Sequence, residues 1–291
     1  MKLSGFLQSP DFLASLPRKS REELRSLIFT KGREWFDAYP EESMVIARNL
    51  RAFAIPATSA LVREIQNNVL LHYYEKMLPL CLSPREYHSY LTDSVAMPPE
   101  FETLAADAGS NSGVVIAVCH FGAVECIAPA LAARGIPVTG ALRFTTPGLA
   151  DAARARSGAM AASGMFASVN FIEIGTDRPA ALDMAAVLRR GSVLLAVFDE
   201  KTPYSLPVTL LRRQVWGGAG LDRLVRFAQP GARVFTAFAE RADDERCELR
   251  LHRLDADDPM LVQSLYNDLE PLLMCRCAQW YFLHEEIPFV N

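Results

Sequence analysis

The apolar residues of the first 100 positions recur at helical spacing. Leu61, Ile65 and Val69 fall on one face of a helix, and the segment Ser20-Arg-Glu-Glu has the capping-box pattern that marks a helix start. Prolines punctuate the end of this region. We therefore expect residues 1–100 to form an amphipathic helical layer that packs against the rest of the protein.

Beyond residue 113 the pattern changes to short apolar runs that alternate with helical segments. Val114–Val118 is a continuous apolar run, which is typical of a strand buried on both faces of a parallel sheet. The expected fold class is α/β: a central, mostly parallel mixed sheet flanked by helices, with an N-terminal helical layer. We predict strands at 114–119, 137–142, 169–174, 192–198, 206–211, 233–239 and 247–252, and helices near 123–134, 148–164, 178–190, 218–228 and 259–278.

Segment 105–113, AADAGSNSG, is small and polar, and we interpret it as a linker. The expected organisation is a helical N-terminal subdomain at 1–105 and an α/β core at 106–291. A chain of 291 residues can bury a sizeable core in either one domain or two.

The net charge of −4 and the pI near 5.8 give no reason to expect nucleic acid or an anionic bilayer as partner. No stretch reaches the roughly 18 consecutive apolar residues of a spanning helix, and no signal peptide is recognisable. We expect a cytoplasmic protein, with peripheral association at the inner membrane as the alternative. The six cysteines include no CxxC pair, so neither a zinc ribbon nor a thioredoxin-like motif is indicated.

The candidate chemistry begins where the first predicted strand ends, at His120–Phe121–Gly122. Open α/β sheets bind ligands at this carboxyl end. Glu125, at the start of the next helix, could hold the His120 ring so that its other nitrogen takes a proton from an alcohol or amine. Alternatively, His120 is a turn residue that caps the helix, and Glu125 is simply favourable near the positive end of the helix dipole. A Cys119 nucleophile is less favoured, since adjacent strand residues point to opposite faces.

The segment CHFGAVE resembles the H-x4-D/E motif of the lysophospholipid acyltransferase superfamily, most closely the bacterial lipid A biosynthesis acyltransferases. Asn usually stands where this chain has Cys119. From about residue 45 onward, further blocks follow in the family's order and approximate spacing. They are ALRFTTPGL (141–149), LRRGSVLLAVFDEK (188–201) and AQWYFLHEEI (278–287), which resemble R-P-x-x-N-P, LRxGxxVxxxxDQ and QWxWxHRRW.

The resemblance implies an acyltransferase that moves an acyl group from acyl carrier protein or acyl-CoA to a hydroxyl or amine. His120 would be the general base and Glu125 its orienting partner, while backbone N–H groups near Gly122 would steady the oxyanion. The acceptor would attack the thioester directly, with no covalent acyl-enzyme, metal or organic prosthetic group. The alternatives are a thioester hydrolase that uses water, a lipid A-type membrane acyltransferase and a non-catalytic binding protein.

Three further residues are candidates for substrate binding. Arg143 matches the arginine of the second block and could hold an anionic or oxygen-rich group; the alternative is a surface arginine after a strand. Asp199 and Glu200 follow another buried run, and Glu200 replaces the family's Gln. These carboxylates could hold a positive substrate group, orient Arg143 or position the acceptor, or they could belong to an ordinary solvated turn.

Departures from the family bear on the acceptor. The chain shows no apolar N-terminal anchor, is acidic overall, and carries Glu285–Glu286 where the family has a basic pair. We therefore predict a water-soluble or carrier-tethered acceptor. His284 lacks the spacing to form a metal site with His120, and Trp280 and Phe282 are interpreted as packing residues. A solvated helix face is favoured over an acidic carrier protein's docking site for the basic residues Arg18, Lys19, Arg21 and Arg25.

Overall fold

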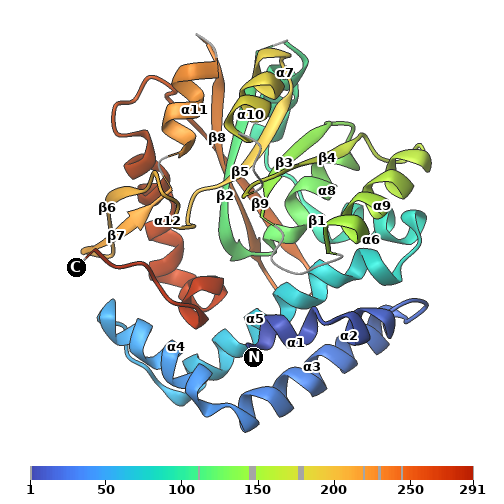
Figure 1. Cartoon of the computed structure of the whole chain (residues 1–291), viewed down its shortest axis with the longest axis vertical. Helices are drawn as coiled ribbons and strands as arrows, with labels where there is room; N and C mark the ends of the chain where they lie inside the picture. The colour runs from blue at the N-terminus through green and yellow to red at the C-terminus, as the bar shows by residue number, and fades with distance from the viewer. Residues whose placement is uncertain are drawn as a thin grey trace.

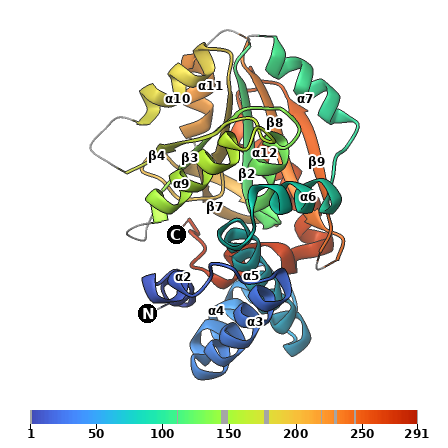
Figure 2. The same ribbon diagram turned by 90° about the vertical axis from the view of Figure 1, so that its right-hand side faces the viewer.

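A computed structural model of the chain describes residues 2–110, 112–143, 149–175, 180–218, 220–228, 231–243 and 245–290. It has the predicted α/β class, with a mostly parallel mixed sheet flanked by helices. Figures 1 and 2 both place the N-terminal helices together at one end of the sheet. These helices are α1 (Leu3–Leu7), α2 (Pro10–Ala14), α3 (Arg21–Ala38), α4 (Pro40–Ala52), α5 (Ser59–Cys81) and α6 (Pro84–Ser94).

Seven strands form the main sheet in the order β1-β9-β8-β2-β5-β3-β4. Neighbours in this sheet are parallel except β8 and β9, which are antiparallel. Two further strands, β6 and β7, form a separate antiparallel hairpin. The bounds are β1 Val95–Ala96, β2 Val114–Gly122, β3 Val138–Leu142, β4 Val169–Glu173, β5 Val193–Val197, β6 Leu206–Leu210, β7 Arg213–Gly217, β8 Arg233–Arg241 and β9 Cys247–Leu254.

The connections that leave the adjacent parallel strands β2 and β5 run in opposite directions across the sheet. From β2 the chain runs outward through β3 to β4, and from β5 it crosses back over β2 to β8. Right-handed crossovers place the helices that follow these two strands on opposite faces of the sheet. The carboxyl ends of β2 and β5 therefore form a topological switch point, the position at which open α/β sheets bind ligands. The helices of this part are α7 (Glu100–Gly109), α8 (Ile127–Ala132), α9 (Leu149–Ala162), α10 (Ala180–Arg189), α11 (Gly220–Ala228) and α12 (Leu261–Arg276).

Helix α5 packs against three short 3-10 helices: η1 (Val124–Cys126), η2 (Cys277–Gln279) and η3 (Tyr281–His284). Because η1 follows β2 directly, this packing puts α5 beside the carboxyl end of β2. A buried ion pair fastens it there, since Arg241 at the end of β8 donates to both carboxylate oxygens of Glu75 at 2.8 and 2.7 Å. Both side chains are about 5% exposed or less, so the pair needs each partner to offset the cost of desolvation.

The segment 105–113 is not simply a linker. Residues Glu100–Gly109 form helix α7, so the boundary predicted at 105/106 falls inside a helix. Leu104 of this helix is buried, and the helix contains alanines, which are strong helix formers. These features outweigh the small, polar composition that predicted a linker. One cluster of buried apolar residues extends from the N-terminal helices, through Leu70, to Ile116 of the sheet.

The predicted strands and helices occur close to their expected positions, but the two-residue strand β1 and strand β7 were not predicted. The hairpin of β7 with β6 turns at Leu211 and Arg212, which both have positive φ angles, 48° and 63°. Such turns normally contain Gly, Asn or Asp. A turn without these residues gave no sequence signal that a second strand would follow.

Candidate active site

His120 and Asp199 meet at the switch point between β2 and β5. Val118 of β2 pairs with Val197 of β5, so His120 and Asp199, each two positions further along the chain, lie side by side. The Nδ1 atom of His120 is 2.9 Å from Asp199 Oδ1. The backbone N–H of His120 donates to the other carboxylate oxygen, Oδ2, at 3.0 Å. The parallel register therefore builds a His–Asp pair from residues 79 positions apart.

Asp199 is held by a third donor from the C-terminal segment. The indole Nε1–H of Trp280 donates to Asp199 Oδ2 at 3.1 Å. An isolated bridge between Trp280 and Phe121 ties this segment to the end of β2. Asp199 is only 3% exposed, and three N–H groups are directed at its two oxygens. Trp280 thus has a polar contact at the site in addition to the predicted packing role.

The second nitrogen of His120, Nε2, faces a more open environment. Glu200 Oε1 lies 3.8 Å from it, too far for a hydrogen bond, and the Glu200 side chain is 46% exposed. Burial lowers the pKa of His120, but the charge and hydrogen bond of Asp199, with smaller effects of Glu200 and Glu125, outweigh it and raise the pKa above 6.5. An imidazole in this setting is a stronger base than one in water.

Glu125 does not contact His120 as predicted; Asp199 makes that contact. Instead, Glu125 Oε1 lies 3.5 Å from His72 Nε2 and 3.5 Å from Lys76 Nζ, both on α5. The His72 ring centroid is 6.4 Å from that of His120. Burial, with Lys76 next, holds the pKa of His72 well below its usual value, so this imidazole is neutral at pH 7. Residues of the N-terminal layer therefore reach the site.

The aromatic ring of Tyr281 packs beside both histidines. Its centroid is 4.5 Å from His72 and 6.0 Å from His120, and its hydroxyl is 2.6 Å from that of Tyr73. Phe282 meets the His120 ring edge to face at 5.1 Å. These rings come from η3, and together they restrict how the imidazole of His120 can turn.

Gly122 has a structural reason to be glycine. Its φ is +59°, and an added Cβ would lie 1.9 Å from the carbonyl oxygen of Ala239. The pairing of β2 with β8 shifts register between Val118 and Gly122. The shift lets β2 end against β8 while His120 stays level with Asp199. The role predicted for backbone groups near Gly122 in oxyanion binding stays a prediction.

Arg143 is exposed just beyond β3. Ala141 pairs with Ala196 of β5, so Arg143 is level with Phe198 and two strands from His120, a backbone separation of about 10 Å. Residues 144–148 of the same resemblance block lie outside the described residues. The substrate-binding role of Arg143 stays a prediction.

The thiol of Cys119 is unsuited to nucleophilic attack. It is 1% exposed, and burial, with the nearby charge of Asp199, raises its pKa well above the usual value. The thiol therefore stays protonated at neutral pH, whereas the thiolate is the reactive form.

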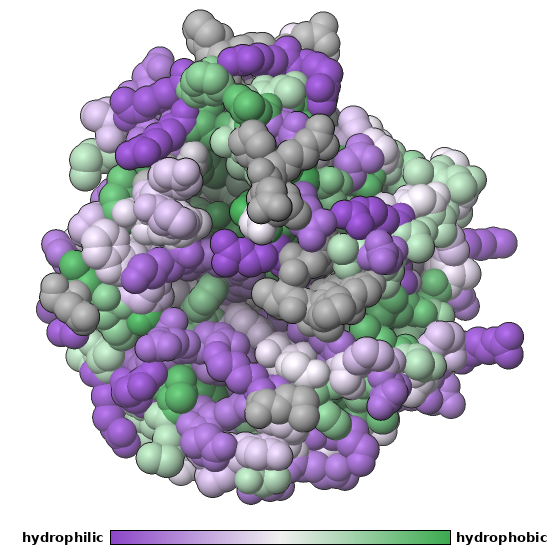
Figure 3. Space-filling view, viewed as in Figure 1, coloured by the Kyte–Doolittle hydropathy of each residue, from purple (hydrophilic) through white to green (hydrophobic). Residues whose placement is uncertain are grey.

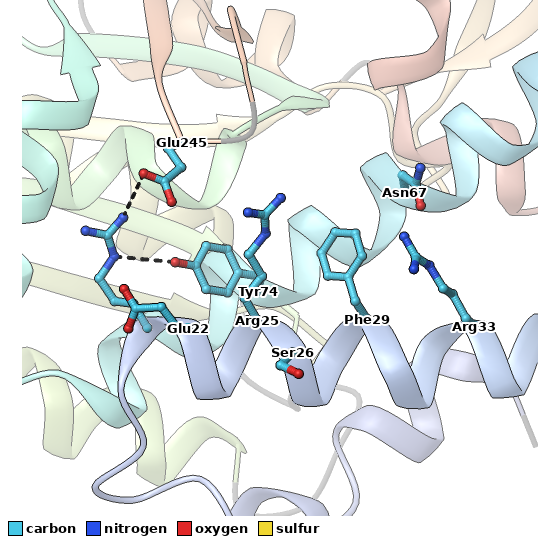
Figure 4. Close-up of a pocket in the computed structure, with 9 residues that line it drawn as sticks. Glu22, Arg25, Ser26, Phe29, Arg33, Asn67, Tyr74 and Glu245 are labelled. Atoms are coloured by element: carbon cyan, nitrogen blue, oxygen red, sulfur yellow. Dashed lines mark hydrogen bonds and ion pairs between the residues drawn. The ribbon is translucent and has the colours of Figure 1, made fainter.

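Basic residues of α3 line hollows on another part of the surface. Figure 4 shows Arg25, Phe29 and Arg33 along α3, facing Asn67 and Tyr74 of α5. This hollow has a volume of about 450 Å³, and Arg21 on its rim lies 3.6 Å from Glu245. Arg18 and Lys19 line a neighbouring hollow together with several carboxylates. Within the described part of the chain, none of the predicted site residues lines either hollow.

No protein-family model matches the chain, and a search of curated proteins gave no match. The resemblance to the lysophospholipid acyltransferases therefore stays a prediction. Among the described residues, no helix is both long enough and apolar enough to cross a membrane. On the face shown in Figure 3, apolar residues are interspersed with hydrophilic ones over the N-terminal helices.

Proposed function

We propose that the protein is an acyltransferase of the H-x4-D/E type that moves an acyl group from a thioester to a hydroxyl or amine. The observation that carries the proposal is the 2.9 Å contact between His120 Nδ1 and Asp199 Oδ1 at the switch point. It commits one ring nitrogen to a buried carboxylate and leaves Nε2 toward the partly exposed Glu200. A general base that acts on an incoming nucleophile needs this arrangement.

The reaction then needs no covalent acyl-enzyme. Nε2 of His120 takes the proton of the acceptor O–H or N–H as the acceptor's oxygen or nitrogen bonds to the thioester carbonyl carbon. The carbonyl π electrons move to oxygen and return when the C–S bond breaks. The leaving thiolate takes the proton from the imidazolium, which Asp199 stabilises while it is charged.

The donor would be acyl-CoA or an acyl group on a phosphopantetheinylated carrier protein. Either would present the same thioester, and the chemistry calls for neither a metal nor a prosthetic group. A carrier protein would bring acidic helices, and the arginines of α3 offer a docking surface for them. We place the reaction in the cytoplasm, where acyl thioesters are made.

For the acceptor we propose a water-soluble or carrier-tethered molecule, with an amine favoured. Asp199 is committed to three N–H donors. Glu200, which is 46% exposed and 3.8 Å from His120 Nε2, is the carboxylate placed to hold an ammonium beside the base. A phosphorylated acceptor would instead meet the negative charges of Glu200 and Glu125.

The test compares wild type with His120→Ala. Purified protein is incubated with acyl-CoA and acyl-carrier donors, with and without the small-molecule fraction of a host extract. Thiol release is followed, and mass spectrometry identifies the acylated product. Loss of the base should lower transfer by about two to four orders of magnitude. His252→Ala is the matched control, because His252 also lies 2.8 Å from a carboxylate, that of Asp268, but is 63% exposed.

Each result separates the candidate functions. Thiol release that needs the extract and depends on His120 supports transfer, whereas equal release without any acceptor would indicate a hydrolase. Equal turnover in wild type and His120→Ala would overturn the mechanism. Restoration of lipid A acylation by expression in a strain deficient in it would overturn the soluble acceptor while leaving the base in place.

A further inference from the structure

The N-terminal layer brings a positive charge to the site. His72 and Lys76 are four residues apart on α5 and so lie on the same helix face. Each places a nitrogen 3.5 Å from the same oxygen of Glu125. The ammonium of Lys76 is therefore at most 7.0 Å, twice this 3.5 Å distance, from His72 Nε2, and the His72 ring is 6.4 Å from that of His120.

Negative charge dominates the surroundings of His120. The carboxylates of Asp199, Glu200 and Glu125 all act on its imidazole. Attack on a thioester creates a further negative charge, on the former carbonyl oxygen. In a partly buried site this charge would be strongly disfavoured unless a cation or several N–H donors were aimed at it.

Lys76 is better placed to meet this charge than the other cations near this edge of the sheet. Arg241 is 5% exposed and gives its guanidinium to Glu75. The ammonium of Lys201 lies over the Trp216 ring of the β6–β7 hairpin. Arg143 follows β3, two strands away from His120. Lys76 is 30% exposed, so a substrate can reach its ammonium.

Glu125 has a consistent role in this arrangement. Its side chain is 31% exposed, and the 3.5 Å separation from Lys76 is longer than a tight ion pair. Glu125 can thus direct the flexible Lys76 chain toward the site while an incoming oxyanion still finds N–H donors on the ammonium. The neutral His72 adds no competing positive charge.

We infer that Lys76 is a catalytic residue that binds the negatively charged oxygen of the tetrahedral intermediate, with Glu125 as the positioning residue that holds Lys76. The inference rests on the proposed function. Electrons move from the carbonyl π bond to the oxygen that Lys76 contacts, and they return as the C–S bond breaks, so Lys76 neither gains nor loses a proton.

The first experiment measures thiol release by Lys76→Met, Lys76→Arg, Glu125→Gln and the surface control Lys31→Met. Lys31 is paired with Glu34 at 2.8 Å on α3 and is 44% exposed. Lys76→Met keeps the aliphatic stem and should lower kcat by about 10²- to 10³-fold with little change in KM. Lys76→Arg should recover much of the rate. Glu125→Gln should lower kcat only about two- to fivefold, the value of a partly exposed ion pair.

The second experiment measures binding by calorimetry, with decylphosphonate as the anionic tetrahedral probe and decanol as its neutral counterpart. Lys76→Met should weaken phosphonate binding by about ten- to a hundredfold, since a charged hydrogen bond is lost, and should leave decanol binding unchanged. A purely structural Lys76 would instead weaken both ligands, raise KM and lower the melting temperature.

The inference is overturned if Lys76→Met keeps kcat within about threefold of the wild type, well short of the loss expected for an oxyanion contact. It is also overturned if the wild type binds the phosphonate no more tightly than Lys76→Met does. Its failure is distinguishable from that of the proposed function. If thioester turnover depends on His120 but not on Lys76, only this inference fails. If the wild type turns over no thioester, the proposed function fails, and phosphonate binding alone then tests whether Lys76 binds an anion.

Discussion

Asp199→Asn is the substitution that tests the core of the site most directly. Asn has the same shape as Asp but only one accepting oxygen. That oxygen is required at the Oδ2 position, where the backbone N–H of His120 and the indole N–H of Trp280 both donate. The new NH2 group therefore faces His120 Nδ1, which lies 2.9 Å from the present Oδ1.

The change should invert the tautomer of His120. Facing an NH2 donor, Nδ1 must accept, so the proton moves to Nε2 and this nitrogen can no longer take a proton from the acceptor. We expect turnover to fall by about 10³- to 10⁴-fold, the cost of holding a catalytic imidazole in the wrong tautomer. The loss of charge-assisted hydrogen bonds at a buried carboxylate should also lower the free energy of unfolding by about 1.5–3 kcal/mol.

The pH profile gives a second readout. The base is active when His120 is neutral, so kcat/KM should rise with pH, with a midpoint above 6.5 because the site raises the His120 pKa. Asp199 is the largest source of that increase after the opposing effect of burial. In Asp199→Asn the midpoint of the residual activity should therefore move to lower pH, and histidine ring ¹⁵N shifts should report the altered tautomer.

Glu125→Gln is the comparison that can refute this reasoning. Glu125 contacts His72 and Lys76 rather than His120, so its substitution should cost far less turnover than Asp199→Asn. If Glu125→Gln lost as much turnover as Asp199→Asn and moved the pH midpoint further, Glu125 would be the orienting carboxylate. Asp199→Asn with turnover within about tenfold of the wild type would likewise contradict the tautomer argument.

Two further predictions concern the frame around the site, and urea unfolding measures both. Gly122→Ala should lower the free energy of unfolding by about 3 kcal/mol or more, because positive φ and a backbone clash add; Gly135→Ala, with φ +84° in open space, should cost only about 1 kcal/mol, and equal losses would contradict the clash. Arg241→Met should cost about 3–5 kcal/mol by leaving the Glu75 carboxyl group buried without its ion-pair partner, and the double variant with Glu75→Met should recover most of this loss. No recovery would show that packing, not charge, dominates.

Much of the fold could be predicted because its signals are local. A run such as Val114–Val118 can be interpreted from its own composition, since a strand buried on both faces must be apolar throughout. The position of His120 at the carboxyl end of that strand follows from the same run. Strand β7 was missed because the turn at Leu211 and Arg212 uses residues that rarely adopt positive φ.

The partners of His120 were harder to identify, because they depend on contacts between segments far apart in the chain. A sequence separation of five residues made Glu125 the natural candidate, yet strand order and register place Asp199 beside the ring. Trp280 was recognised only as part of an aromatic block. Lys76 gave no signal on its own, since a lysine on a long helix is ordinary until the face on which the helix docks is known.

The geometry gives the orienting role that was expected of Glu125 to Asp199, and places Glu125 beside a lysine instead. A carboxylate that orients a base must be buried and saturated with donors, as Asp199 is, because its value lies in fixing one tautomer. One that guides a flexible cation must instead be partly exposed and loosely bound, as Glu125 is. The turn directly after β2 can supply a partly exposed carboxylate, such as Glu125, more easily than a buried one. Asp199, at the end of β5, is buried because it has neighbours on both sides. The neighbouring strand, rather than the turn after His120, is therefore the natural source of the orienting group.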